Sequence, residues 1–192
     1  MADPLYRFLV ITAVTLTVAW LGWSLYDSFA GRAQPGDSAY LAANRFFEDG
    51  DYERALKEYQ AALEQAPEHI HALRGQARTL MQLGRLDEAL GVFDRAIDAA
   101  PRFGATYANR GILYDRMGRY TKAIADYEKA LELDPDLAQG PNWLTRFLRL
   151  QPEKPPTIAE RARYLKEQMA KPPAQRVLRV PELDARQRPY KQ

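Results

Sequence analysis

Three residues whose side chains could bind a metal or move a proton stand together at positions 68 to 71. His69 and His71 are the only histidines of the chain, and Glu68 precedes them. Imidazole nitrogens and carboxylates are common zinc ligands and general bases. A metal site, however, needs at least one more converging ligand, and the chain contains no cysteine. We therefore place the pair in a turn at the surface and predict no metal, no cofactor and no enzyme activity.

Composition removes further classes of function. The absence of cysteine excludes disulfide bonds, a thiol nucleophile and a lipidated cysteine anchor. Lysine and arginine together number 13 against 18 aspartates and glutamates in residues 36–137, but 12 against 5 in residues 138–192. The middle of the chain is therefore acidic and its C-terminal part basic. No constellation of residues indicates a small-molecule substrate.

The first element along the chain is an apolar segment. Residues 8–26 follow a short N-terminal tail, 1–7, and contain no charged side chain. As a helix they would be about 28 Å long at about 1.5 Å per residue, which matches the hydrocarbon core of a bilayer. Trp20, Trp23 and Tyr26 gather at one end, where aromatic rings favour the membrane boundary. The segment predicts a transmembrane anchor; a cleaved signal peptide is the alternative.

Two properties of this anchor follow from its residues. Arg7 favours a cytoplasmic N-terminus, which leaves the rest of the chain in the periplasm of a bacterium. We therefore expect a single-pass protein of the bacterial inner membrane. Small or hydroxylated side chains share one helix face, as they do where transmembrane helices pack together, at Thr12, Thr15, Ala19 and Gly22. The alternative is a simple anchor whose threonines bond their own backbone.

Most of the remaining chain repeats every 34 residues. A linker at 27–38 leads to three windows, 36–69, 70–103 and 104–137. Each window carries small residues around a large ring, a central glycine and a final proline, as in Ala43, Gly50, Ala55, Tyr59, Ala62 and Pro67. Small residues let two helix backbones approach, a ring fills the space beside that contact, and a glycine with positive φ ends the first helix. Each window therefore predicts a helix pair, and the pairs must stack to bury a core.

The stretch YANRGILYDRMGRYTKAIADYEKALELDP at 107–135, with the same columns in the two earlier windows, resembles the tetratricopeptide repeat family. The resemblance covers residues 36–137. Ala39 departs from the large residue that Leu73 and Tyr107 keep, which fits a terminal repeat. The resemblance implies a three-repeat α-solenoid that binds proteins and has no catalytic role. The whole chain is therefore expected to be all-α, with the transmembrane helix, this solenoid, a capping helix and a basic C-terminal extension in that order.

The resemblance also implies binding residues. Some family members clamp a partner's C-terminal carboxylate with lysine and asparagine side chains on the first helices of successive repeats. The residues in those columns are Asn44, Arg74, Arg78 and Asn109. They could hold a carboxylate or an acidic peptide through charge-assisted hydrogen bonds. Gln139 and Trp143 stand where the clamp has cations, so a groove with an unrelated ligand is the alternative. We expect the two arginines to be exposed and to do little for folding.

Two more helices are predicted after the repeats. Residues 138–151 place Trp143, Phe147 and Leu150 on one face, which predicts a helix that caps the third repeat. Residues 152–171 hold a capping-box pair at Thr157 and Glu160. The apolar stripe of this second, basic helix, which suits docking on an acidic surface, consists of Ile158, Ala162, Leu165 and Met169.

An extended basic tail, 172–192, ends the chain. Its prolines and charges argue against a core of its own, and nucleic acid is not expected because no aromatic platform is present. Apolar anchors for docking as an extended peptide are spaced among the charges at Val177, Leu178, Val180, Leu183 and Tyr190. The target is either the chain's own acidic repeats or a partner protein. We favour the partner, because a second attachment point raises the effective concentration.

These features predict a membrane-anchored scaffold for protein–protein interaction. Its partners would be proteins of a membrane complex, and the N-terminal helix would hold it at the membrane. We expect an assembly or accessory factor of a bacterial envelope complex. The alternative is a constitutive structural subunit of a membrane protein complex, which would co-purify with the mature complex in a fixed ratio.

Overall fold

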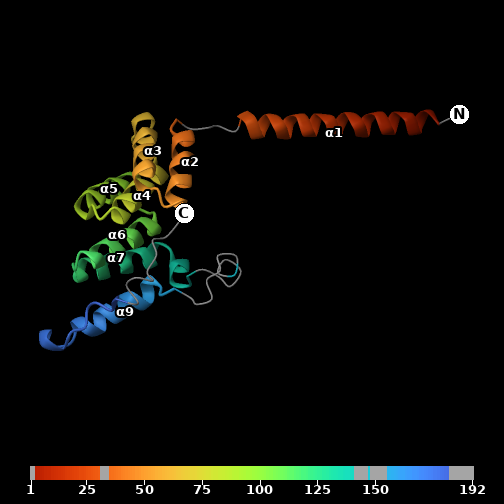
Figure 1. Cartoon of the computed structure of the whole chain (residues 1–192). Coiled ribbons are helices and arrows are strands. Elements are labelled where there is room, and N and C mark those ends of the chain that lie inside the picture. The colour runs from red at the N-terminus through yellow and green to blue at the C-terminus, as the bar shows by residue number, and fades with distance from the viewer. Residues whose placement is uncertain (1–2, 31–34, 141–146, 148–154, 182–192) are drawn as a thin grey trace.

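A computed structural model describes residues 3–30, 35–140, 147 and 155–181, and these residues contain helices and turns but no strand. The α-helices are α1 (Pro4–Ala30), α2 (Asp37–Glu48), α3 (Tyr52–Gln65), α4 (Ile70–Gln82), α5 (Leu86–Ala99), α6 (Gly104–Arg116), α7 (Tyr120–Leu133) and α9 (Ile158–Met169). Two short 3-10 helices are η1 (Pro135–Ala138) and η2 (Pro173–Gln175). Figure 1 shows α2 to α9 stacked in chain order, with α1 standing apart from them.

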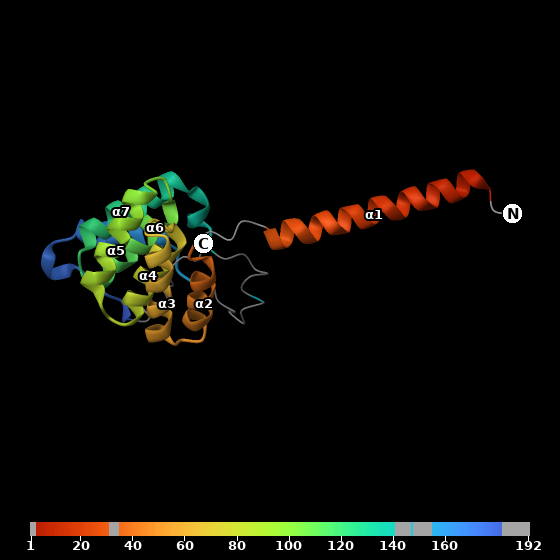
Figure 2. The same cartoon turned by 90° about the horizontal axis from the view of Figure 1, so that it is seen from above.

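The stack is built from helix pairs. The pairs α2–α3, α4–α5 and α6–α7 fall within the three 34-residue windows, and each pair packs most extensively on itself. The pairs join through contacts of α3 with α4 and of α5 with α6. Contacts also run from α2 to α4 and from α4 to α6, so the first helices of the three pairs lie along one side of the stack (Figure 2).

Close approach of helices requires the small residues of the repeat. Gly111 in α6 lies against Tyr127 of α7, and a Cβ at Gly111 would come within 2.6 Å of that ring. Gly75 in α4 meets Tyr59 of α3 even more closely, because a Cβ there would come within 2.2 Å of the ring atom Cε1. The expected small-to-ring contact is confirmed within the third repeat, and a second one joins the first repeat to the next.

The central glycines end the first helix of each pair. Gly50, Gly84 and Gly118 have φ values of 80°, 74° and 74°, which confirms the expected left-handed conformation. In the first repeat the amide of Asp51 then donates to the carbonyl oxygen of Phe46 at 2.9 Å, which closes the turn before α3. The same left-handed turn in each repeat gives the three pairs the same geometry.

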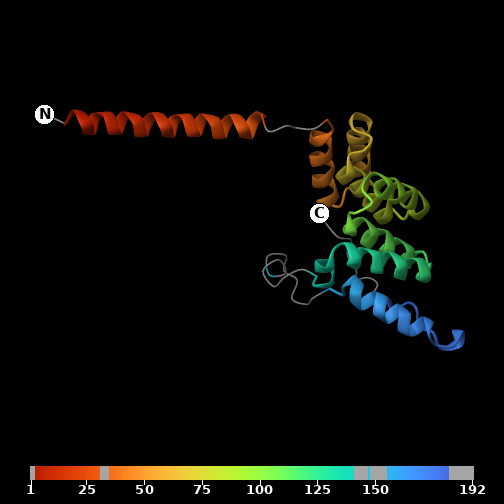
Figure 3. The ribbon, with the colours of Figure 1, turned by 180° about the vertical axis from the view of Figure 1, so that it is seen from behind.

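The N-terminal helix is longer than the apolar segment. It continues through Ala30, and α2 begins at Asp37, so the region expected as a linker is partly helical. Gly36 packs on the first repeat. Its amide donates to Gln65 Oε1 at 3.2 Å. Its φ is 89°, and a Cβ at this position would come within 2.6 Å of the Ala62 carbonyl oxygen. Figure 3 shows α1 from behind, still separate from the stack.

Residues Pro4–Tyr26 of α1 are long and apolar enough to cross a membrane, with a mean hydropathy of 1.9. This window is 0% buried, so it is not a core helix, although a signal sequence would meet the same criterion. Thr12 Oγ1 donates to the Phe8 carbonyl at 2.9 Å, and Thr15 Oγ1 to the Ile11 carbonyl at 2.8 Å. The threonine hydroxyls are therefore bonded within their own helix; Ala19 and Gly22 lie exposed on it.

The cover of the last repeat differs from our expectation. Most of the predicted capping helix, including Trp143 and Leu150, lies outside the described residues. Phe147, which is described, has 69% of its surface exposed. The helix that packs on α7 and η1 is α9, with Ile158, Ala162 and Leu165 buried in the core. The helix expected to dock on an acidic surface thus covers the chain's own third repeat.

The start of α9 agrees with the sequence. Thr157 caps the helix by accepting from the Glu160 amide at 3.2 Å, and Glu160 Oε2 accepts from the Thr157 amide at 2.8 Å. Both halves of the predicted capping box are therefore present.

Candidate protein-binding groove

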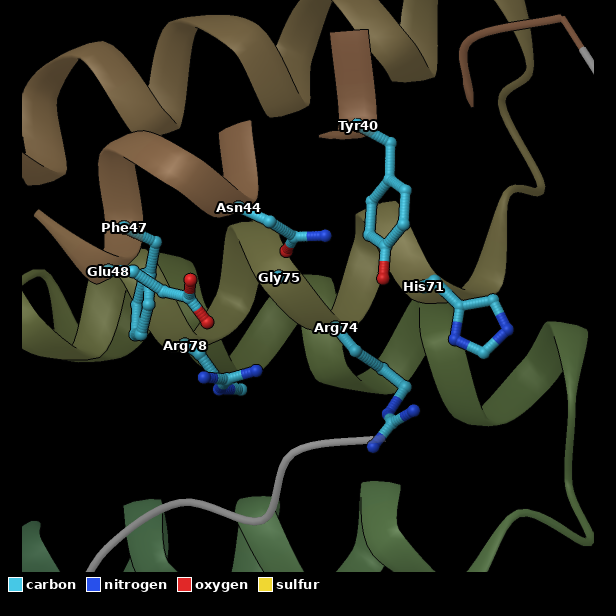
Figure 4. A pocket seen from close by; sticks show the side chains of 8 residues that line it. All are labelled: Tyr40, Asn44, Phe47, Glu48, His71, Arg74, Gly75 and Arg78. Atoms are coloured by element: carbon cyan, nitrogen blue, oxygen red, sulfur yellow. The ribbon is translucent and has the colours of Figure 1, made fainter. Parts of the chain in front are cut away.

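A pocket of about 180 Å³ opens between α2 and α4, on the side formed by the first helices. Figure 4 shows side chains from the two helices converging on it. The lining residues are Tyr40, Asn44, Phe47, Glu48, His71, Arg74, Gly75 and Arg78. Glu48 is the one carboxylate among these eight residues, opposite two guanidinium groups. The pocket therefore combines a cationic wall with aromatic surface.

The two arginines lie against rings. Arg74 Cζ is 4.3 Å from the ring centre of Phe103, and Arg78 Cζ is 4.6 Å from that of Phe47. Arg74 is only 2% exposed and Arg78 is half-buried. Our expectation of exposed groove cations is thus wrong, because the stacked rings and neighbouring helices remove them from water. Both side chains contribute to packing as well as charge.

Burial changes the electrostatics of this pair. Desolvation, reinforced by the charge of Arg78, lowers the pKa of Arg74 to about 10. Desolvation also lowers the pKa of Arg78, against the opposing influence of Tyr59, Tyr40 and Glu48. Among the described residues, Arg78 Nε is buried without a hydrogen-bond partner. An anion in the pocket would therefore relieve an existing cost of burying positive charge.

Asn44 reaches the pocket in a fixed orientation. Its Oδ1 accepts a hydrogen bond from the Tyr59 hydroxyl at 2.6 Å. The carboxamide nitrogen is left as a donor at the pocket (Figure 4). Burial raises the pKa of Tyr59 to about 12, so this phenol remains a donor throughout the neutral range. The bond ties the second helix of the first repeat to the pocket wall.

The structure brings together three of the four residues expected from the clamp columns. Asn44, Arg74 and Arg78 line the pocket, whereas Asn109 is fully buried in α6 and does not. Gln139 is exposed and donates to Asp136 Oδ1 at 3.0 Å, while Trp143 lies outside the described residues. The pocket is therefore confined to the first two repeats.

Other lining residues were not singled out from the sequence. Tyr40, Phe47 and Glu48 come from α2, three or four residues from Asn44. This spacing places them on one helix face and could have identified them. His71 was considered only as a metal ligand. Its ring lies 6.1 Å from Tyr40 and 6.3 Å from Phe103, between centroids, so it extends the aromatic rim of the pocket.

The other histidine has a structural role that the sequence did not reveal. His69 Nδ1 accepts from the Ala72 amide at 3.2 Å and so caps α4. Its Nε2 lies 3.0 Å from Asp37 Oδ1, and the side chain is 7% exposed. The ring is thus buried where α4 meets the start of α2, in contrast to the surface turn that we expected. Within the described part of the chain, no three His, Cys, Asp or Glu side chains are grouped to hold a metal.

The first half of the tail lies on the chain itself. The Tyr164 hydroxyl and Arg161 Nη2 donate to the carbonyls of Val177 and Leu178, at 2.7 and 3.1 Å. Leu178 packs against the core, whereas Val177 is 56% exposed. For these residues the tail contacts α9, contrary to our preference for a partner. Val180 is half-buried, and Leu183 and Tyr190 lie outside the described residues.

Comparison with known proteins agrees with the repeat geometry. Residues 40–102 and residues 104–137 each match a family profile described as tetratricopeptide repeat. The chain is a tetratricopeptide repeat protein. Its three helix pairs are the three repeats, and the pocket between α2 and α4 lies between the first helices of repeats one and two.

Two curated relatives of this tetratricopeptide repeat protein, both from eukaryotes, match its repeats. It is 32% identical over 92 residues to Hsp70-Hsp90 organizing protein 3 of Arabidopsis thaliana, covering 48% of this chain and 16% of that one. It is 29% identical over 138 residues to Stress-induced-phosphoprotein 1 of Caenorhabditis elegans, covering 72% and 41%. The matched regions therefore span less than half of the length of these relatives.

Solved structures share the fold. The second TPR of Spaghetti (RPAP3), bound to the HSP90 peptide SRMEEVD, is 25% identical, with a TM-score of 0.51 over 53% of this chain and 94% of that one. The first TPR of the same protein, bound to the same peptide, is 18% identical, with a TM-score of 0.59 over 73% and 97%. Tetratricopeptide domains mediate protein–protein interaction, so the fold of this protein is one for binding proteins.

Proposed function

We propose that this protein is a membrane-anchored scaffold whose groove binds an anionic segment of a partner protein. The observation that carries the proposal is the pocket between α2 and α4, where the guanidinium groups of buried Arg74 and half-buried Arg78 face a single lining carboxylate. A peptide carboxylate would accept charge-assisted hydrogen bonds from Arg74 and Arg78, and the amide of Asn44 would add a neutral donor. The stacked rings hold both guanidinium groups in place before a ligand arrives.

The peptides bound by similar folds support an anionic ligand. The peptide in both Spaghetti structures, SRMEEVD, carries three acidic side chains. The negative charge of that peptide, and not the identity of its source protein, is what we carry over to the ligand of this chain. The probe is therefore a negatively charged peptide with a free C-terminus.

The exposed apolar helix supports the membrane part of the proposal. Because the Pro4–Tyr26 window is 0% buried and has the length of a span, we assign it as an anchor. We further propose an assembly or accessory factor of a bacterial envelope complex, with the repeats in the periplasm. Reporter fusions after Gly36 test this topology. A reporter active only in the cytoplasm would contradict it.

A constitutive subunit of a membrane complex is the second candidate. It is favoured by the basic C-terminal part and the anchor, which could both be buried against partners. Purification from native membranes separates the two. A fixed ratio to a mature complex indicates a subunit, whereas enrichment with incomplete complexes indicates an assembly factor.

The binding experiment uses the full chain in detergent micelles. Fluorescently labelled SRMEEVD is titrated by anisotropy, beside the matched peptide SRMQQVN with an amidated C-terminus. We expect saturable binding of the first peptide and at least tenfold weaker binding of the second, because each lost charge-assisted hydrogen bond contributes about 1.5 to 3 kcal/mol. Equal affinities would contradict an anionic ligand.

A further inference from the structure

The turn between the two helices of a repeat carries a different charge in the third repeat than in the other two. The equivalent residues of the three repeats are 48–54, 82–88 and 116–122. The first stretch contains four acidic side chains and one basic one, and the second contains two acidic and one basic. The third contains three basic side chains, at Arg116, Arg119 and Lys122, and no acidic one. The third turn is therefore a local excess of positive charge.

A second basic segment lies against this turn. Residues 171–181 contain three basic side chains, at Lys171, Arg176 and Arg179, and again no acidic one. Arg179 Nη2 donates to the carbonyl oxygen of Arg116 at 3.1 Å, which joins the segment to the end of α6. We call the two segments together, 116–122 and 171–181, the basic edge. Folding thus brings six cations together from two distant parts of the chain.

A second pocket, of about 320 Å³, is lined by both segments of the basic edge and by Met169 of α9. The cations at this pocket are Arg119, Lys122 and Arg176. None of its lining residues is acidic, whereas Glu48 faces the guanidinium groups in the groove. This pocket therefore leaves its positive charge to be neutralised by a ligand or a surface.

The backbone that carries these cations is held in place by hydrogen bonds. The amide of Val177 donates to Gln168 Oε1 at 3.0 Å, and its carbonyl oxygen accepts from the Tyr164 hydroxyl at 2.7 Å. Arg176 Nε donates to the Lys171 carbonyl oxygen at 2.9 Å. Residues 171–179 are thus fixed against α9 and the third repeat, and their charges form a fixed array.

The charges of the basic edge face water. Arg119, Lys122, Lys171 and Arg179 are exposed. Asp87 lies 3.5 Å from Arg119, but its side chain is 87% exposed, so this ion pair neutralises little of the charge. Val177, which is 56% exposed, places an apolar side chain among the cations. Cations around an exposed apolar group are typical of surfaces that rest on lipid headgroups.

The candidate span in the same chain indicates which anionic surface the basic edge meets. Clusters of about four to eight lysines and arginines beside a membrane span bind anionic lipid headgroups. Only residues 31–34 separate α1 from the start of the described stack at Pro35, and four extended residues reach about 14 Å. A stack tethered so closely meets the membrane at a high effective concentration. Weak attraction by each cation is then sufficient for docking.

We propose that the basic edge docks on anionic phospholipid headgroups of the membrane that holds α1. Because α2, α4 and α6 run in one direction, the basic edge lies at the end of the first helices, opposite the start of α2 where the chain enters the stack. Docking therefore lays the stack along the membrane and holds the groove beside it. The inference rests on the proposed anchor and is independent of the ligand of the groove.

A fluorescent label on the basic edge tests the docking in the full chain. Ala174→Cys gives a single labelling site, because the chain has no native cysteine and Ala174 is exposed. The protein is reconstituted in nanodiscs that contain a headgroup-labelled acceptor lipid. We expect energy transfer to be about twofold greater when phosphatidylglycerol is mixed with phosphatidylcholine than in phosphatidylcholine alone, and to lose this difference in about 1 M salt, where the Debye length is about 3 Å.

The control label reports on the first repeat, which stays tethered by α1 in both nanodiscs. Gln60→Cys is exposed on α3 and lies outside the basic edge. We expect its energy transfer to change less with lipid composition. Equal transfer from the Ala174→Cys label in the two kinds of nanodisc would overturn the proposal.

Paired variants separate this surface from net charge. Arg119→Gln with Lys122→Gln removes two exposed cations of the basic edge, and Arg95→Gln with Arg102→Gln removes two exposed cations elsewhere. We expect the equilibrium constant for docking to fall about 25-fold in the first variant, about fivefold for each cation, and to change little in the second. Melting curves check that both are folded. An equal loss in the two variants would show that net charge acts, and not this surface.

An acidic protein is the alternative occupant. Poly-glutamate added to the phosphatidylcholine nanodiscs tests it through the fluorescence of the Ala174→Cys label. A response that Arg119→Gln with Lys122→Gln abolishes, without any response to phosphatidylglycerol, would assign the surface to a protein and overturn the membrane. If the chain does not enter nanodiscs, the anchor is wrong. Sedimentation with vesicles of phosphatidylglycerol, beside vesicles of phosphatidylcholine, then tests the basic edge, and equal sedimentation would overturn it.

Discussion

Buried or half-buried arginines occur at two places in this molecule, and the groups that contact them differ. Around the third repeat, Arg161 makes a bidentate pair with Asp115, with N–O distances of 2.7 and 2.9 Å, and Arg110 bonds to both Asp94 and Asp126. In the groove, Arg74 and Arg78 stack on rings, and Glu48 is the single carboxylate among the lining residues. In the first region carboxylates bond to both cations, which also lie near tyrosine rings; in the groove the two cations stack on phenylalanine rings.

The pKa shifts express the same contrast. Burial alone would lower the pKa of Arg110, but the hydrogen bonds and charge of Asp126, with the hydrogen bond to Asp94, raise it above the usual value. At Arg74 burial is not outweighed, and the pKa falls to about 10. Paired cations hold helices together around the third repeat. A surplus of positive charge marks the region where a ligand can add an anion.

The largest effect is expected where the pairing is broken. Asp115→Ala removes the carboxylate that pairs with Arg161 at a site where both side chains are under 10% exposed, and also removes an acceptor of the Tyr127 hydroxyl. We expect a loss of about 3 to 5 kcal/mol in the free energy of unfolding, measured by urea denaturation.

The matched control is an exposed ion pair that also joins the third repeat to α9. Glu128 of α7 pairs with Lys166 of α9, with both side chains about half exposed. Glu128→Ala should cost less than about 1 kcal/mol. A similar loss in the two variants would mean that burial of the pair is not what holds α9.

The next effect concerns the packing beneath the groove. Gly75→Ala places a methyl group 2.2 Å from the Tyr59 ring, so either the ring or α4 must move. We expect a loss of about 1 to 3 kcal/mol, together with weaker peptide binding. Gly91→Ala in α5 has nothing within 4 Å and should instead stabilise the protein by up to about 1 kcal/mol. Thermal melts of the two variants that shift in the same direction would contradict this account.

A smaller change in stability, but a clear one in binding, is expected for Arg78→Ala. The variant loses stacking on Phe47 and should cost about 1 kcal/mol in stability. Its Kd for SRMEEVD should rise at least tenfold. Arg54→Ala is the control, because Arg54 stacks on Phe46 at 4.9 Å outside the pocket. Equal Kd values for these two variants would remove Arg78 from the binding site.

The smallest effect is expected at the tyrosine that orients Asn44. Tyr59→Phe removes one hydrogen bond and should cost about 0.5 to 1.5 kcal/mol near neutral pH. The folded-state pKa of about 12 exceeds the usual 10, so the native protein holds this proton more tightly than the unfolded chain. The corresponding stability is complete below pH 10 and is lost as the pH rises towards 12. Urea denaturation from pH 9 to 11.5 should show a steeper loss for the natural protein than for Tyr59→Phe; parallel curves would contradict the shift.

Local regularity made much of this fold predictable. The 34-residue period, the central glycines and the capping box at Thr157 each depend on residues close in sequence, and the structure has the corresponding helices, left-handed turns and cap. The clamp columns also led to Asn44, Arg74 and Arg78, because equivalent positions of a repeat lie on the same helix face. The N-terminal segment was recognised as a candidate membrane span from its length and hydropathy alone.

Contacts between distant residues could not be derived in this way. The burial of Arg74 depends on Phe103, 29 positions away, and the role of α9 as cover depends on a pair 46 positions apart, Arg161 with Asp115. His69 was misplaced at the surface because its partner, Asp37, lies in another helix. The sequence determined the helices, their period and three of the residues that line the pocket, since these follow from backbone sterics and side-chain spacing. Tertiary structure alone decided which cations lie against acids and which lie against rings at the pocket, because desolvation and charge pairing depend on neighbours that folding brings together.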